Sequence, residues 1–183
     1  MSIAVIYGGT RAGGNTEQLA ERALNGLEAE RIYLKDYDIR AIEDHRHSEE
    51  GFRDRGDDYN AIIDRALRHD ILLFATPIYW YGMSGPIKNF VDRWSQTLRD
   101  ADRPGFREQM KAKTAYVIAV GGDQPLLKGL PLVLQFQHIF GFFGTTYGGY
   151  ILGEGNRPGD IAQDREAMRK ADLLHVQLKE RLS

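Results

Sequence analysis

A glycine-rich stretch near the start of the chain has the composition of an anion-binding loop. It reads GGTRAGGNTEQLA over residues 8–20 and leads from an apolar run straight into a helical pattern. Glycines permit tight turns, and backbone amides at a helix start can face an anion. The stretch predicts a phosphate cradle, although a turn with a good helix cap would explain it more simply. Its candidate ligand-binding residues are Gly9, Thr10, Arg11, Gly14, Asn15 and Thr16.

A second stretch places three aromatic residues side by side directly after a proline. Residues 76–94 read TPIYWYGMSGPIKNFVDRW, and no helix or strand period would bury all three neighbouring rings. A flat apolar ligand would use such a rim for stacking, and glycines would let the backbone approach it. The simpler alternative is that one or two of the rings pack on the following helix. The candidate residues are Pro77, Ile78, Tyr79, Trp80, Tyr81 and Gly82.

A third candidate loop is GGDQP at residues 121–125. Gly121, Gly122 and Asp123 can bring main-chain donors near a planar ligand, although the piece taken alone is equally compatible with a plain turn. Each of the three stretches follows an apolar run, so they are expected to lie at neighbouring strand exits. Their joint occurrence is a stronger signal than any one of them.

The apolar runs and helical patterns alternate along the chain. Buried strands are predicted at 2–7, 70–76, 114–120 and 145–152, and a strand nearer an edge at 31–36. Asn15 or Thr16 can cap the first helix, Asp58 can open the second, and Pro86 suits the first turn of the third. Two further helices are predicted, an apolar one at 130–143 and an amphipathic one at 160–182.

This alternation predicts an α/β fold with a parallel sheet, because each parallel return needs a crossover. Five strands in this length fit a three-layer flavodoxin-like sandwich of strand order 2-1-3-4-5, forming a single domain over residues 1–183. Ligands of such sheets collect beyond the carboxyl ends of the strands, where the three candidate loops are expected. The polar stretch 39–58 is predicted to be a surface excursion.

Composition narrows the possible functions. The 24 basic and 26 acidic residues give a formal charge of −2, so there is no electrostatic reason to expect a nucleic-acid or membrane partner. The chain has no cysteine, which excludes disulfides, thiolate nucleophiles and iron-sulfur clusters. No stretch is expected to approach the roughly 18 apolar residues of a membrane span, and no signal peptide is evident, so a cytoplasmic location is expected.

Several related site classes are excluded by the loops themselves. The first loop lacks a Gly-Lys-Ser/Thr ending and the dinucleotide glycine pattern, so neither kind of nucleotide site is supported. Small tyrosine phosphatases need a thiolate in this loop, and phospho-acceptor receiver domains need an acidic pair there. His45 and His47 form an H-x-H pair that could bind a metal, but solvated histidines are the simpler interpretation, and no metal site is predicted.

The two motifs GGTRAGGNTEQL and TPIYWYGMSGPIKNFVDRWSQTL, in this order, resemble the flavodoxin-like NAD(P)H-dependent FMN reductase family, which includes quinone and azo-compound reductases. The resemblance spans nearly the whole chain. It implies that Thr10, Arg11, Asn15 and Thr16 hold the FMN phosphate. It also implies that residues 77–82 line the flavin ring and that 121–123 approach its other side.

Two departures from the family pattern bear on this interpretation. Gly9 stands where many relatives have a serine, which removes one hydroxyl contact to the phosphate unless Thr10 replaces it. The related iron-sulfur flavoproteins carry a cysteine cluster in the region that here spans residues 39–58. Since this chain has no cysteine, that electron-transfer branch is excluded.

The predicted function is FMN-dependent oxidoreduction. A hydride would pass from NADPH or NADH, through flavin N5, to a flavin, quinone or similar small acceptor, and no side chain is required as acid or base. The alternative is a flavodoxin-type electron carrier, but such carriers are usually strongly acidic; a flavin-free protein-binding module is a third hypothesis. The apolar helix at 130–143 and the aromatic residues near the site predict a homodimer or homotetramer.

Overall fold

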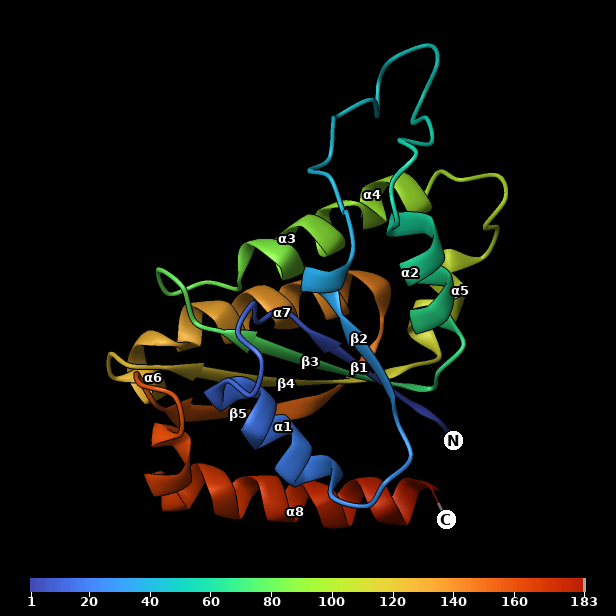
Figure 1. Ribbon diagram of the computed structural model, residues 1–183. Coiled ribbons are helices and arrows are strands. Elements are labelled where there is room, and N and C mark those ends of the chain that lie inside the picture. The colour runs from blue at the N-terminus through green and yellow to red at the C-terminus, as the bar shows by residue number, and fades with distance from the viewer. Residues whose placement is uncertain (183) are drawn as a thin grey trace.

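The computed structural model describes residues 1–182 and contains a five-stranded parallel sheet (Figure 1). The strand order is β2-β1-β3-β4-β5, and all four neighbouring pairs are parallel. This confirms the predicted order 2-1-3-4-5. The strands are β1 (Ile3–Tyr7), β2 (Glu30–Tyr33), β3 (Ile71–Pro77), β4 (Thr114–Gly121) and β5 (Thr146–Glu154).

Helices cover both faces of the sheet, which gives the predicted three layers. In Figure 1, α1 and α8 lie below the sheet, and α3 and α7 lie above it. The helices are α1 (Asn15–Leu24), α2 (Tyr59–Leu67), α3 (Gly85–Asp92), α4 (Trp94–Thr97), α5 (Phe106–Lys111), α6 (Pro125–Lys128), α7 (Leu130–Phe143) and α8 (Arg165–Leu182). Two short 3-10 turns, Leu34–Asp36 and Asp160–Gln163, complete the regular structure.

The strands are apolar on both faces because each face has its own helical layer. In β1, Ala4 and Ile6 join the core beneath the upper helices, whereas Ile3, Val5 and Tyr7 join the core shared with α1 and α8. Period-two alternation therefore sends successive side chains into two separate cores. These cores hold the carboxyl ends of β1, β3 and β4 at one edge of the sheet.

Most predicted elements are confirmed, with differences at their ends. The first helix is capped by Gly14, so Asn15 and Thr16 lie inside it and the predicted caps were wrong. Asp58 does occupy the N-cap position of α2. The edge strand β2 stops at Tyr33, and the three residues after it form a 3-10 turn. Helix caps depend on backbone dihedral angles, which a choice among neighbouring polar residues does not fix.

Two predicted helices are interrupted. The helix beginning near Pro86 breaks at Arg93 into α3 and α4, and the C-terminal helix starts only at Arg165 after a 3-10 turn. The short helices α5 and α6 have too few residues to show a clear apolar period, so the sequence did not predict them. None of these differences moves the three candidate loops from the strand exits.

Helix α7 is the apolar helix predicted at 130–143. Together with α6 it forms a stretch, Pro125–Phe143, that meets the length and composition of a membrane span, so the expectation that no stretch approaches one was wrong. In this structure Phe136 and Phe140 pack against Phe74 of β3, with ring centroids 5.3 and 5.6 Å apart. The apolar character of α7 is thus partly used in the core, although only 33% of that window is buried.

The excursion at residues 39–58 is a mostly exposed loop, as predicted, and extends above α3 and α4 in Figure 1. Its base is fixed by a buried ion pair in which Arg93 Nη1 lies 2.6 Å from Asp57 Oδ2. Arg93 also donates to Arg40 O and lies over the ring of Tyr59. Moving the loop base away would separate the two charges and leave each of them buried without a partner, which is costly. The ion pair therefore holds the base of the loop in one place.

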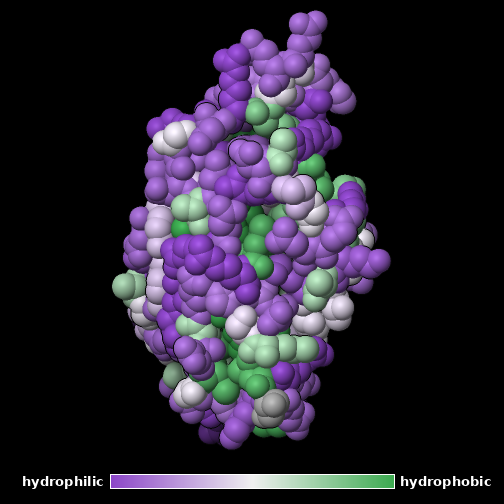
Figure 2. Space-filling model, turned by 90° about the vertical axis from the view of Figure 1, so that its right-hand side faces the viewer, coloured by the Kyte–Doolittle hydropathy of each residue, from purple (hydrophilic) through white to green (hydrophobic). Residues whose placement is uncertain are grey.

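Figure 2 views the side of the molecule on which the strands begin. Hydrophilic residues cover most of this face, and hydrophobic residues form only small, separate areas.

Candidate functional site

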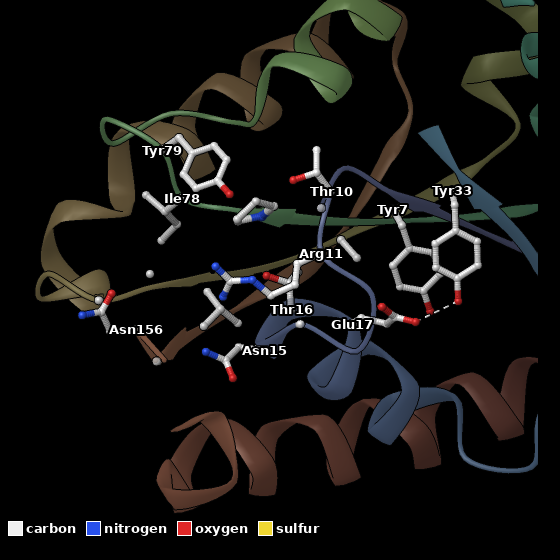
Figure 3. A pocket seen from close by; sticks show the side chains of 18 residues that line it. Tyr7, Thr10, Arg11, Asn15, Thr16, Glu17, Tyr33, Ile78, Tyr79 and Asn156 are labelled. Carbon is white, nitrogen blue, oxygen red and sulfur yellow. Dashed lines mark hydrogen bonds between the residues drawn. The ribbon is translucent and has the colours of Figure 1, made fainter. Parts of the chain in front are cut away.

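A cavity of about 320 Å³ opens at the carboxyl ends of the strands (Figure 3). This volume lies in the range of about 300 to 1,000 Å³ that small-molecule sites occupy. All three candidate loops contribute to its lining, although they are far apart in the chain. The predicted residues that line it are Gly9, Thr10, Arg11, Gly14, Asn15, Thr16, Pro77, Ile78, Tyr79, Gly121 and Gly122.

The first-strand loop presents positive charge and amide donors to this cavity. Figure 3 shows the Arg11 side chain reaching into the middle of the cavity, and no acidic partner for Arg11 is found within residues 1–182. The cap residue Gly14 makes no side-chain hydrogen bond to the helix start. The first amides of α1 therefore lack intrahelical partners, and the helix dipole makes this end positive. Thr16, which is 7% exposed, adds a hydroxyl to the lining.

Asn15 lines the cavity but uses its side chain elsewhere. Its Nδ2 donates to Arg157 O at 2.8 Å, and its Oδ1 accepts from the amides of Gly159 and Ile161 at 2.9 and 3.4 Å. A Cβ added at Gly155 would lie 2.7 Å from Asn15 Nδ2, so the loop after β5 packs closely on this amide. The Asn15 side chain thus links the loop after β1 to the loop after β5 through hydrogen bonds.

A tyrosine-carboxylate network, which sequence analysis missed, supports the first loop from behind. Glu17 accepts the amide of Gly13 at 2.8 Å and the hydroxyl of Tyr33 at 3.0 Å, the latter drawn in Figure 3. The rings of Tyr7 and Tyr33 stack with centroids 4.6 Å apart. Burial and the bond to Glu17 raise the pKa of Tyr33 to about 12, so this hydroxyl keeps its proton. The network holds Gly13 at a φ of +62°, a left-handed conformation that favours glycine.

On the opposite side of the cavity, two glycines allow neighbouring loop segments to pack closely. The amide of Ile78 donates to Val120 O at 2.9 Å, which joins the loop after β3 to the end of β4. A Cβ at Gly121 would lie 3.1 Å from Ile78 Cβ, and one at Gly122 would lie 3.0 Å from Asn156 Cβ. Side chains at these two positions would crowd the wall, so the glycines keep it flat. Asn156 belongs to the lining and was missed by sequence analysis.

Four predicted residues lie outside the lining, namely Trp80, Tyr81, Gly82 and Asp123. Trp80 is 95% exposed, whereas Tyr79 immediately before it lines the cavity. Tyr81 donates its hydroxyl to Asp123 Oδ2 at 3.0 Å, so these two residues contact each other rather than the cavity. Of the aromatic trio, only Tyr79 therefore lines the cavity.

The sequence holds only weak signs that the missed residues belong to the site. Gly155 and Asn156 follow the fifth strand as the other loops follow theirs, so their exit position was the only clue. Glu17 reads as an ordinary acidic residue in a first helical turn, and its bonds to Gly13 and Tyr33 depend on the tertiary fold.

The two histidines of the excursion lie on the exposed loop. His45 approaches Glu43 at 3.6 Å and packs edge-on against Phe52. Within residues 1–182, no group of three or more His, Cys, Asp or Glu side chains is placed to hold a metal ion.

The cavity's chemistry suits a phosphorylated planar ligand such as FMN. One end offers an unpaired guanidinium, a hydroxyl and the free amides of a helix start, which are donors for a phosphate. The other end offers flat glycine walls with Ile78 and Tyr79, where added Cβ atoms would intrude. The observed donor set and the open glycine cradle therefore fit this cofactor.

Comparison with known proteins decides the family. The model of the family described as NADPH-dependent FMN reductase matches residues 1–156. The chain belongs to the NADPH-dependent FMN reductase family. The expected FMN cofactor, NAD(P)H dependence and flavoprotein oxidoreductase activity are confirmed at the level of this family.

Individual relatives agree with membership in the FMN reductase family. YwqN of Bacillus subtilis (strain 168), whose name describes an NAD(P)H-dependent FMN-containing oxidoreductase, is 62% identical over 174 residues, covering 95% of this chain and 96% of that protein. The structure of Trp repressor binding protein from Bacillus subtilis is 55% identical, with a TM-score of 0.81, and the match covers 94% of this chain and 96% of that one.

A more distant structure shows the same fold. NAD(P)H:quinone oxidoreductase from Methanothermobacter marburgensis has a TM-score of 0.73 at 18% identity, with 97% of this chain and 96% of that chain covered. The expected flavodoxin-like fold is thereby confirmed.

Proposed function

We propose that the chain binds FMN in the carboxyl-edge cavity and transfers a hydride from NADPH or NADH to a quinone or similar small acceptor. One observation carries this proposal: the glycine-rich loop after β1 and the aromatic loop after β3 line a single cavity. This supports the proposal because donors suited to a phosphate and glycine walls suited to a planar ring line the same cavity.

At the phosphate end, Arg11, Thr16 and the first amides of α1 are proposed to bind the FMN phosphate. Arg11 supplies the formal charge, and charge-assisted hydrogen bonds are the stronger kind. Gly9 carries no hydroxyl, but Thr10 also lines the cavity and can supply one. Because the side chain of Asn15 is engaged by the loop after β5, its proposed contribution is to position this end of the site.

At the ring end, Tyr79, Ile78 and the glycine pair Gly121–Gly122 are proposed to flank the flavin. FMN held there would supply the hydride chemistry through its N5 position. The net reaction converts NAD(P)H, a proton and a quinone into NAD(P)⁺ and a hydroquinone. The chain's residues bind and orient the reactants, and none of them is needed as an acid or base.

The test is spectroscopic and kinetic. The purified protein should be yellow or should become so with FMN, and its visible absorption should bleach when NADPH is added without oxygen. Steady-state NAD(P)H oxidation with a quinone should then proceed without a partner protein. A folded sample that takes up no FMN would refute the proposal, and uptake with negligible turnover would favour the electron-carrier alternative.

A homodimer, or a homotetramer built from it, is proposed to cover α7. Leu134 and Phe142 on this helix are 51% and 58% exposed. Beside them a groove of about 900 Å³ runs between α7 and the α3–α4 segment and includes Leu98 and Ile139. Exposed apolar area of this kind is typical of an association surface. An elution volume matching one 20.8 kDa chain would contradict this proposal.

A small-molecule acceptor and a cytoplasmic location complete the proposal. The net charge of −2 supports a small acceptor rather than nucleic acid or a membrane surface. The cytoplasm is proposed because it holds the pool of NAD(P)H that the reaction consumes. Cell fractionation with an antibody against the chain would test the location.

A further inference from the structure

The turn at Tyr79–Gly82 has an unusual backbone for its sequence. Tyr79 and Gly82 exchange two backbone hydrogen bonds, at 3.1 and 3.0 Å, which close a two-residue turn. The central residues Trp80 and Tyr81 both have positive φ, at 47° and 65°. Turns of this type favour asparagine and glycine, because larger side chains resist the left-handed conformation. Two bulky aromatic residues are thus held in a disfavoured conformation beside the cavity.

Side-chain contacts hold this turn in place. The Tyr81 hydroxyl donates to Asp123, whose carboxylate accepts Lys128 Nζ at 2.7 and 2.8 Å. Lys128 Nζ also lies 5.9 Å from the centroid of the Tyr81 ring. These three residues link the turn after β3 to the segment after β4, and we call them the Tyr81 latch. The latch keeps the Tyr81 ring in the protein and leaves the turn's other aromatic residue without such contacts.

Trp80 is the residue that the latch leaves exposed. Its side chain is 95% exposed, whereas the chain's other tryptophan, Trp94, is 2% exposed in the core. Trp80 directly follows Tyr79, which lines the cavity, so its backbone lies one residue beyond the lining. Backbone strain at a functional site indicates a residue that is held for a task rather than for stability.

We propose that Trp80 determines acceptor specificity by stacking on planar aromatic second substrates, chiefly quinones, at the rim of the cavity. Tyr81, Asp123 and Lys128 are positioning residues in this proposal, which rests on the proposed FMN-dependent function. The electron-rich face of an indole complements an electron-poor quinone ring, and aromatic pairs prefer offset stacking of this kind.

Substitution of Trp80 should separate planar from non-planar acceptors. With NADPH as donor, Trp80→Ala should raise the KM for 1,4-naphthoquinone about 2- to 12-fold, which corresponds to about 0.5 to 1.5 kcal/mol for one aromatic pair. The KM for ferricyanide, which offers no ring to stack on, should stay within error. Trp80→Phe should retain most of the naphthoquinone affinity, and Asp123→Asn should raise its KM through a less well-held turn.

Measurements of FMN binding distinguish a failure of the role proposed for Trp80 from a failure of the proposed function. Tyr150→Ala is the matched control, since Tyr150 is a 46% exposed aromatic residue on β5 outside the cavity lining, and its kinetics should match the wild type. FMN titration of each apoprotein should show binding, and a failure there refutes the function itself. Acrylamide should quench about half of the tryptophan signal in the FMN-free protein, because only Trp80 is exposed.

Three results would overturn the role of Trp80 while leaving the FMN-dependent function standing. The first is an unchanged KM for naphthoquinone in Trp80→Ala. The second is an equal rise for naphthoquinone and ferricyanide. The third is a Trp80 that acrylamide cannot reach, which would show that a second copy of the chain covers it.

Discussion

The sheet has one edge where the strands begin and one where they end, and the two differ in the pairing of particular charged side chains and in backbone conformation. At the edge where the strands begin, the ammonium of Lys113 donates to Leu67 O and His69 O at 2.7 and 2.5 Å. Glu30 there accepts from Arg65 and contacts His69. At the edge where the strands end, Arg11 has no acidic partner within the described chain, and the left-handed non-glycine residues gather there: Trp80, Tyr81 and Gln124.

This difference indicates which edge serves stability and which serves binding. Strained backbone lowers stability and is found at functional sites, where surrounding contacts hold it in place. Substitutions at the strand-start edge should therefore change stability without changing FMN affinity. Substitutions at the cavity edge should change ligand binding. One of them, Trp80→Asn, should also increase the stability of the apoprotein.

The largest effect is expected for Arg11→Met at the cavity edge. Removing the guanidinium should weaken FMN binding by about 10- to 150-fold, since a hydrogen bond to a charged group contributes about 1.5 to 3 kcal/mol. Flavin fluorescence titration of the apoprotein measures this change. Urea unfolding of the apoprotein should be unchanged, and equal FMN affinity in wild type and variant would remove Arg11 from the site.

Lys113→Met tests the opposite edge. Lys113 is 5% exposed, and its loss would leave two backbone carbonyls without their donor. The free energy of unfolding should fall by about 1 to 3 kcal/mol, the cost of unpaired buried polar groups. Lys111→Met, at an exposed position nearby, is the control and should change little. A weaker FMN affinity at full stability would contradict the division between the two edges.

Trp80→Asn should stabilise the apoprotein. Asparagine adopts left-handed conformations more readily than tryptophan, and relief of one strained residue contributes about 1 kcal/mol. Thermal or urea unfolding would show the gain. Tyr150→Asn removes an exposed aromatic residue that does not have a positive φ, and it should give no such gain. Loss of stability in Trp80→Asn would mean that the turn is not strained.

The smallest effect is a pH dependence at Glu30. Burial acts to raise the pKa of Glu30, but hydrogen bonds from His69 and Arg65 outweigh it and hold the pKa below its ordinary value of 4.5. The folded state therefore favours the carboxylate. Its stabilisation is present above that ordinary value and is lost as the pH falls through the folded-state pKa.

Comparison of wild type with Glu30→Gln over a range of pH measures this contribution. The difference in unfolding free energy should be below about 1 kcal/mol at neutral pH, as for partly exposed ion pairs. It should shrink as the pH falls below about 4.5. A difference that grows on acidification would show that the sign is wrong.

The sequence predicted the fold because most strands are compact apolar runs and most of the longer helices show an apolar period. It predicted the location of the site for a related reason, since parallel strands bring their exits to one edge. What it did not predict are contacts between distant side chains. Asn15 reads as a phosphate ligand until Arg157 and Gly159 are seen to engage its amide.

The aromatic trio illustrates the same limit. Three neighbouring rings indicate a planar ligand, but which ring faces it depends on backbone dihedral angles. The pairing of Tyr81 with Asp123 joins residues 42 positions apart. No local pattern encodes that pairing, so Trp80 and Tyr81 were predicted to line the ring, whereas in the structure they lie outside the cavity lining.

The most direct test of the central claim compares FMN with riboflavin in binding titrations of the apoprotein. If the loop after β1 binds the phosphate while the loops after β3 and β4 flank the ring, FMN should bind at least about 10-fold more tightly than riboflavin. That preference should largely disappear in Arg11→Met. Equal affinities for FMN and riboflavin in the wild-type protein would contradict the account.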